Sequence, residues 1–316
     1  MLMPKARGEV SEAVFAALRD PDRGCQVPLG VRVDDPEDLH IALWALYELH
    51  YQGFDDADED LEWHPDLLRV RLALERRFEA DLRSRYVAPT GAEDFASSFF
   101  DYVAAFDGPS LASYVKGRAD RQQVLDLLRL KSIYHLKESD PTSWLVPRLP
   151  PAAKAGLVEL LFDEYGAGDP NQLHAHLFAK GLEASGLSGA YGAYIDEASL
   201  EVLEDSNAMS MFGLNRRLRA AALGHLAAFE ATSSLPSRRM AQGLARLSFP
   251  REMIDYYEEH VEADAVHEQL AVRVICAAVL AHEPYLRDDL FFGAFTSLDL
   301  ADRFARRMLG QWGVSA

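Results

Sequence analysis

The sequence predicts an all-α protein, and three observations support this prediction. Apolar residues recur at helical spacing through most of the chain, and no strand-like alternation competes with them. Proline, aspartate and glycine stand where these periodic segments begin and end. No glycine-rich nucleotide-binding motif and no internal repeat is found. The residues therefore predict helices that pack into a bundle.

The N-terminal part holds three helical patterns. Residues 36–53 begin with a proline followed by acidic residues and stop at a glycine. Residues 64–86 carry an apolar stripe on one side and charge on the other, and residues 92–106 predict a shorter helix. The first pattern has more apolar surface than a lone helix leaves in water, so we expect residues 1–115 to pack against the rest of the chain or against a second subunit.

The second part of the chain continues the helical pattern. Asp120 caps a helix that ends before Pro141. The pattern breaks between Gly108 and Gly117, where we place a boundary between an N-terminal helical extension, residues 1–115, and a helical bundle, residues 116–316. Further helices of the bundle are expected around residues 152–166, 169–186, 215–234, 251–271 and 300–312.

Composition limits the function. The chain has 316 residues, and 50 acidic against 32 basic residues leave a net charge of −18. A chain with this net negative charge is repelled by nucleic acid and by anionic membranes, so neither is an expected partner. The N-terminus lacks the apolar stretch of a signal peptide, and the apolar run near residues 270–281 is broken by Arg273 and too short to cross a bilayer. We expect a cytoplasmic protein.

Only two cysteines are present, Cys25 and Cys276. This number predicts neither a disulfide framework nor a thiolate metal site. Any metal ion must therefore be held by histidine and carboxylate side chains.

Residues 256–271, YYEEHVEADAVHEQLA, place two histidines and a carboxylate at offsets 0, 4 and 7, namely His260, Asp264 and His267. On a helix these offsets point to about 0°, 40° and −20°, so the three side chains share one narrow stripe. The stripe is either a set of metal ligands or part of a solvated acidic face. The neighbouring glutamates mostly lie off the stripe, which favours ligands.

Three other segments carry candidate ligands. Glu138 lies at the end of the helix capped at Asp120, Glu164 precedes His174 by ten residues, and Glu230 lies on an alanine-rich helix where a buried acid needs a partner. Ten residues of straight helix rise about 15 Å, so Glu164 and His174 reach one ion only if the chain bends between them, at residues 166–170. Each residue alone is more typical of an exposed helix end. Together with the stripe they form the ligand set of a diiron or dimanganese centre.

The order of these seven residues, ending in H-x3-D-x2-H, resembles the haem-oxygenase-like diiron oxidases and oxygenases. Within that family it resembles the diiron N-oxygenase domain of the nitrosourea synthase of streptozotocin biosynthesis. The phrase DEYGAGDPNQLHAHLF also resembles proteins named iron-containing redox enzymes. The resemblance covers about residues 118–316, whereas residues 1–115 carry no chemical motif.

The resemblance implies a haem-oxygenase-like seven-helix bundle that binds two irons, cycles them between Fe(II) and Fe(III), and uses O2 as cosubstrate without haem. One iron would be held by Glu138, Glu164 and His174. The other would be held by Glu230, Asp264 and His267, with bridging carboxylates and with His260 as an additional ligand. Carboxylates suit this role because they bind hard cations and can shift between bridging and terminal positions.

The resemblance further implies oxidation of a small molecule with electrons from an external donor. We expect N-oxygenation of an amine or amino-acid-derived substrate in biosynthesis, with oxidative C–C cleavage or desaturation of an amino acid or fatty acid as the alternative. Arg216 is a candidate to hold a substrate carboxylate. The full set of pocket candidates is Tyr134, Tyr165, Phe178, Met209, Phe212 and Arg216.

Hypotheses of other classes stay open. The same bundle could serve as a metal-free binding module. A thiaminase-like hydrolase would need a nucleophilic cysteine, but Cys276 follows His267 by nine residues and lies on the opposite side of a continuous helix. We also expect a homodimer.

Overall fold

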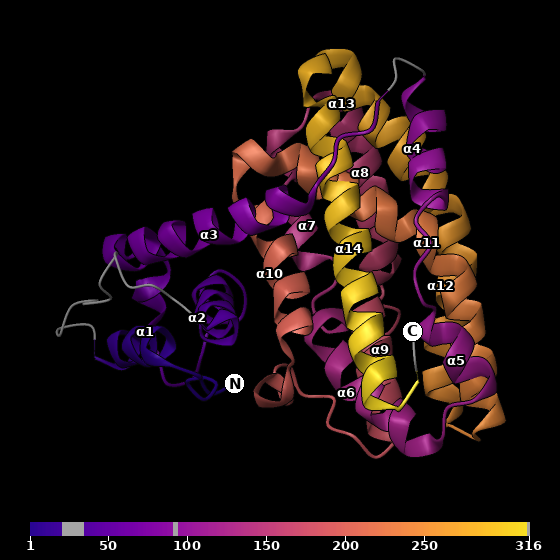
Figure 1. Ribbon diagram of the computed structural model, residues 1–316, viewed down its shortest axis with the longest axis horizontal. Coiled ribbons are helices and arrows are strands. Elements are labelled where there is room, and N and C mark those ends of the chain that lie inside the picture. Colours follow the sequence, from indigo (N-terminus) through magenta and orange to yellow (C-terminus); the bar gives the residue numbers. More distant parts are fainter. Residues whose placement is uncertain (21–34, 91–93, 315–316) are drawn as a thin grey trace.

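The computed structural model describes residues 1–20, 35–90 and 94–314, apart from the side chains of residues 262–265. Within these ranges the chain is helical and contains no β-strand, which confirms the all-α prediction (Figure 1). The long helices form a bundle, and the first helices form a lobe beside it.

The lobe consists of α1 (Glu9–Arg19), α2 (Pro36–Glu48) and the first part of α3 (Pro65–Arg85), which runs from the lobe to the bundle (Figure 1). Asp35 caps α2 by accepting a hydrogen bond from the main-chain N–H of Glu37. Asp38 accepts hydrogen bonds from the main-chain N–H groups of Val10 and Ser11 and so holds the start of α1. The lobe is therefore tied together by carboxylates at helix N-termini.

The bundle begins with α4 (Phe95–Ala104), α5 (Leu111–Gly117), α6 (Arg121–His135) and the short α7 (Asp140–Ser143). It continues with α8 (Pro151–Glu164), α9 (His174–Ala184), α10 (Leu200–Leu214) and α11 (Arg219–Arg246). It ends with α12 (Arg251–Gln269), the π-helix η7 (Leu270–Cys276), α13 (Ala277–His282) and α14 (Arg287–Gln311).

Two apolar cores hold the molecule together. The first includes Trp44 of α2 and Phe291 of α14, so the lobe and the bundle share it. The second lies among α5, α6, α9, α11 and α12 and includes Leu128, Phe178 and Met253. The described residues before position 115 thus pack on the bundle, as expected, while the domain division itself stays a prediction.

The crossing of α11 and α14 depends on two glycines. A Cβ atom on Gly224 would lie 1.8 Å from the carbonyl oxygen of Leu290, and one on Gly293 would lie 1.9 Å from that of Ala221. Only glycine allows the two backbones to approach so closely. This contact fixes the position of α11, which carries Glu230.

Several helix predictions need correction. The passage from Gly108 to Gly117, predicted as a break, contains α5, whose N-terminus is capped by Ser110. Helices α1 and α10 were not predicted, and α14 begins well before residue 300. Helix α11 continues past Pro236 to Arg246 because Met240 and Leu244 of its second half are buried in the second core.

One helical stretch among the described residues, Arg251–His282, has the length and apolar composition that a membrane span needs. Its first part, α12, packs against α9 and α11 inside the bundle. A core helix of a soluble protein passes the same test, so this finding is weak evidence for a membrane span.

Candidate metal centre

Glu138 is placed by α6 and the turn that follows it. Asp120 caps α6, as predicted, by accepting from the main-chain N–H of Gln123. The helix ends at His135, and Glu138 follows in the turn before α7, with its side chain buried. This turn directs Glu138 to the interior of the bundle.

The predicted bend between Glu164 and His174 is confirmed. Helix α8 ends at Glu164, a short turn occupies residues 166–168, and α9 begins at His174. Gly166 has φ +72°, and a Cβ there would lie 2.5 Å from the main-chain nitrogen of Leu173. The turn brings Oε2 of Glu164 within 3.0 Å of Nδ1 of His174.

Helices α11 and α12 supply the remaining donors. Glu230 is buried on α11, and His260 and His267 are buried on α12. Glu258 and Glu259 are exposed on the other side of α12, as the angular sorting predicts. Asp264 lies on the same helix, but its side chain falls outside the described residues.

The buried donors form two adjacent groups. Glu138, Glu164, His174 and His260 offer atoms that all lie within 4.8 Å of one another, and so do Glu164, Glu230 and His267. Glu164 belongs to both groups. We call these residues together the carboxylate cluster. The structure thus brings together six of the seven predicted ligands. It places His260 in the group of Glu138, with Nε2 of His260 3.2 Å from Oε1 of Glu138.

The donor atoms of the cluster lie at separations that ligands of a shared metal ion would have. Two ligand atoms at right angles, each about 2.1 Å from an ion, are roughly 3 Å apart. Nδ1 of His174 lies at this separation from Glu164 yet makes no hydrogen bond to a described residue. Nδ1 of His267 and Oε2 of Glu230, 3.6 Å apart, are likewise buried without a hydrogen bond in the described part of the chain.

The far nitrogens of two histidines are held by the protein. Nδ1 of His260 donates to the main-chain oxygen of Tyr256 at 2.8 Å, which leaves Nε2 facing Glu138. Nε2 of His267 lies 3.3 Å from Oδ2 of Asp163, which leaves Nδ1 facing Glu164 and Glu230. Such partners of the second nitrogen are typical of metal-bound histidines because they fix the tautomer and the ring orientation.

The cluster is rich in negative charge. Burial opposes ionisation of Glu138, but hydrogen bonds from His135 and His260 hold its pKa well below the usual range. Burial also opposes the ionisation of Glu164, but the contacts with His174 and His267 outweigh it and lower the pKa of Glu164 to about 2. Burial and the charge of Glu164 raise the pKa of Glu230. A divalent cation would neutralise this surplus of carboxylates.

Three supporting residues were missed by the sequence analysis. His135 donates from Nδ1 to Oε2 of Glu138 at 2.9 Å, and the hydroxyl of Tyr256 donates to the same oxygen at 3.0 Å. Asp163 orients His267. A positional signal exists for each: His135 precedes Glu138 by three residues, Tyr256 precedes His260 by one helical turn, and Asp163 adjoins Glu164.

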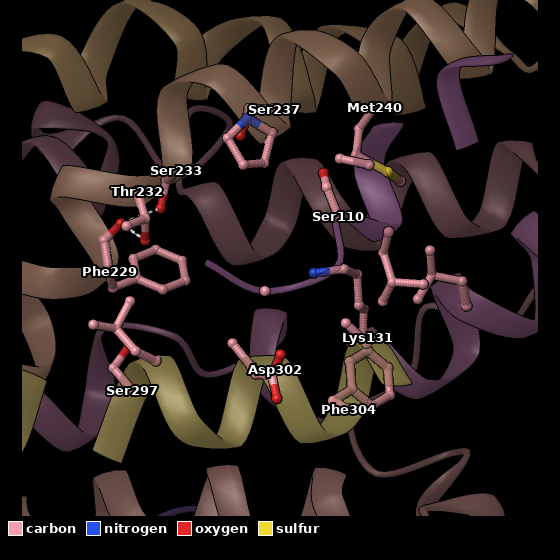
Figure 2. A pocket seen from close by; sticks show the side chains of 18 of the residues that line it. Ser110, Lys131, Phe229, Thr232, Ser233, Ser237, Met240, Ser297, Asp302 and Phe304 are labelled. Atoms are coloured by element: carbon pink, nitrogen blue, oxygen red, sulfur yellow. Dashed lines mark hydrogen bonds between the residues drawn. The ribbon is translucent and has the colours of Figure 1, made fainter. Parts of the chain in front are cut away.

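A cavity of about 420 Å³ borders the cluster and is lined by His135, Tyr256 and His260 on that side. We call it the large cavity (Figure 2). Two smaller spaces beside Glu138 are lined by Tyr134, and one of them also by Met209 and Phe212.

The other pocket candidates lie elsewhere and correct the prediction. Arg216 is exposed in a short turn before α11 and lines none of these three spaces. Phe178 is fully buried against His135 and Tyr256 as part of the second core. Tyr165 is 37% exposed and donates to Asp140. Helical spacing could not tell cavity-lining residues from core or surface residues, because it gives the direction of a side chain and not its neighbours.

A family model described as iron-containing redox enzyme matches residues 125–302. The match includes every donor of the carboxylate cluster. No curated protein matches the chain.

Proposed function

This chain belongs to the iron-containing redox enzyme family, and we propose that it is an O2-dependent oxidoreductase with a non-haem diiron centre. The observation that carries the proposal is the membership of Glu164 in both groups of donors. Glutamates and histidines from facing helices of a bundle are typical of the di-iron carboxylate proteins.

We assign the donors by their groups. Glu138, His174 and His260 would hold one iron, and Glu230 and His267 would hold the other, with Glu164 between them. The resemblance of the sequence adds Asp264 to the second iron. When bound, iron that alternates between Fe(II) and Fe(III) supplies redox chemistry with O2 that no side chain supplies alone.

The other residues position this site and control its surroundings. His135 and Tyr256 fix the orientation of Glu138, and Asp163 fixes that of His267. Burial and the charge of Glu138 raise the pKa of Tyr256 well above its ordinary value, so its hydroxyl keeps its proton beside the cluster. The large cavity adjoins this point, so a substrate bound in it would lie beside the cluster.

The reaction that we propose first is N-oxygenation of an amine or amino-acid-derived substrate. It is supported by the resemblance of the ligand order to the N-oxygenase branch. The reaction converts an N–H bond to N–OH, consumes one O2, two protons and two electrons, and releases one water. An external donor must supply the two electrons. The apolar wall of the large cavity favours a second candidate, the oxidation of a C–H or C–C bond in an aliphatic acid.

The first experiment counts iron. Anaerobic loading with Fe(II), followed by gel filtration and elemental analysis, should give two irons per chain. His174→Ala should lose iron, whereas His176→Ala should retain both irons, because His176 lies on the same helix but is exposed. A wild-type chain that binds no iron would refute the proposed centre.

The second experiment identifies the reaction. The iron-loaded chain is supplied with a chemical reductant and with either small amines or aliphatic acids, while an electrode follows O2 and mass spectrometry identifies products. Oxygen added to nitrogen supports the first reaction. Turnover restricted to the acids would replace it with the second.

A further inference from the structure

The large cavity is built by helices from separate parts of the chain. The start of α5 and side chains from α6, α11, α12 and α14 form its wall. Most of the wall is apolar, with Leu127, Phe229, Met240 and Phe304 among its residues. Hydroxyl groups such as those of Ser110 and Ser297 interrupt it (Figure 2). The cavity therefore suits a ligand with an apolar body and few polar groups.

Among the described residues that line this cavity, Lys131 is the only lysine or arginine. Figure 2 shows its side chain reaching into the cavity. Its amino group lies 3.5 Å from Nε2 of His135 and forms no ion pair with a carboxylate in the described part of the chain. Burial lowers the pKa of Lys131, although Asp205 and Glu138 oppose this effect.

The hydrogen bond to His135 leaves part of the ammonium group available. Nδ1 of His135 donates to Glu138, so Nε2 is the ring nitrogen that faces Lys131 and takes up one of its hydrogen bonds. An ammonium group has three N–H donors, which leaves two for a ligand in the cavity.

The acidic residue of the same wall limits the charge of that ligand. Asp302 is paired with Arg306 at 2.8 Å, and its Oδ1 atom is buried without a hydrogen bond to a described residue. Its carboxylate disfavours a second negative group on the α14 side of the cavity. Because Arg306 already pairs with Asp302, the ammonium group of Lys131 is left to compensate a single negative group on the ligand.

We propose that Lys131 binds the carboxylate of a monoanionic substrate whose apolar body lies in the large cavity. This inference rests on the proposed function, because it places the other end of the substrate toward His260 and the carboxylate cluster. Lys131 takes the role that the sequence analysis assigned to Arg216. It is a specificity-determining residue, since a buried ammonium group is compensated by a carboxylate and not by a neutral group.

The test compares three probes of equal length: hexanoate, hexanamide and hexylamine. Isothermal titration calorimetry on the full chain, with and without Fe(II), should show that hexanoate binds at least tenfold more tightly than the other two. Lys131→Met should abolish this preference, and Lys131→Arg should retain it. Lys116→Met is the matched control, because Lys116 is exposed on neighbouring α5 and should leave the preference unchanged.

Lys131→Met keeps the length of the side chain and removes a buried charge, so we expect it to fold, which circular dichroism verifies. The proposal is overturned if hexanoate binds no better than hexanamide, or equally well to Lys131→Met. Iron content distinguishes the two proposals. A chain that prefers hexanoate without binding iron would refute the diiron centre alone, and a chain that binds two irons without this preference would refute the role of Lys131 alone.

Discussion

Lys137 and Glu138 are consecutive residues, and their buried side chains belong to two polar clusters of different character. Lys137 forms an ion pair with Glu48 of α2, which also accepts from the hydroxyl of Tyr191 at 2.7 Å. The ammonium group of Lys137 lies 4.6 Å from the ring centre of Tyr51. We call these four residues the Lys137 cluster. Its positive and negative charges balance each other, and its partners all come from the protein.

The carboxylate cluster around Glu138 is not balanced in this way. It gathers three glutamates around three histidines, and some of its donor atoms have no hydrogen bond within the described residues. Burying charge is costly unless it is paired, so the two clusters are stabilised differently. The Lys137 cluster is complete within the protein, whereas we propose that a cation completes the carboxylate cluster. Three predictions test this contrast, and a fourth concerns a buried histidine outside both clusters.

The largest effect is expected from Glu164→Ala. The substitution removes the carboxylate common to both donor groups, so the bound iron should fall from two per chain to none. Elemental analysis after gel filtration measures the loss. Glu259→Ala, which changes an exposed glutamate on α12, should bind iron like the wild type. Retention of both irons in Glu164→Ala would show that Glu164 is not shared.

Lys137→Met should destabilise the fold while leaving iron binding intact. The substitution leaves Glu48 buried and unpaired, which costs about 3–5 kcal/mol in the free energy of unfolding. Chemical denaturation measures this change. The double variant Lys137→Met with Glu48→Gln should recover most of the loss, because no lone charge remains. A destabilisation that iron fully reverses would contradict a purely structural role.

Asp163→Asn should weaken the binding of one iron. Loss of the carboxylate that orients a metal-bound histidine lowers affinity by about 10–100-fold. The side chain of Asp163 is 53% exposed, so we expect an effect near tenfold. Competition with a chelator measures the affinity, and Glu159→Gln, one turn earlier on α8 and exposed, is the control. An unchanged affinity would mean that His267 is held in place by packing alone.

The smallest effect concerns His40, a buried residue of α2 that is neutral in the fold. Burial, followed by the charges of Arg303 and Arg85, lowers its pKa to about 3, and the amide of Asn207 lies 3.1 Å from its Nδ1. The unfolded chain binds a proton near pH 6.5, so His40 stabilises the fold above that pH and loses this contribution as the pH falls.

Between pH 6.5 and 5.5 the loss from His40 should be about 1 kcal/mol. Denaturation gives the free energy of unfolding of the wild type and of His40→Gln at both pH values, and the larger fall in the wild type is the contribution of His40. An equal fall in both proteins would show that His40 takes up a proton in the folded protein. Iron should not alter the result, because His40 is not part of the carboxylate cluster.

The sequence by itself determined the helical class, most of the bundle helices and the inward direction of His260 and His267 on α12. These features are local, because the period of apolar residues, a capping aspartate and a glycine-rich bend act within a few residues of the chain. The bend at Gly166 could be predicted because a straight helix would separate Glu164 from His174 by about 15 Å. The same reasoning missed α5, whose short apolar pattern is stabilised by contacts with α11.

Only the tertiary structure decided which residues share a site. It grouped His260 with Glu138, brought His135 and Tyr256 behind that glutamate, and placed Lys131 in a cavity wall while leaving Arg216 exposed. Periodicity gives the direction of a side chain from its own helix axis. The distance between side chains on different helices depends on how those helices cross, and here on contacts such as Gly224 against Leu290, which couple residues far apart in the chain.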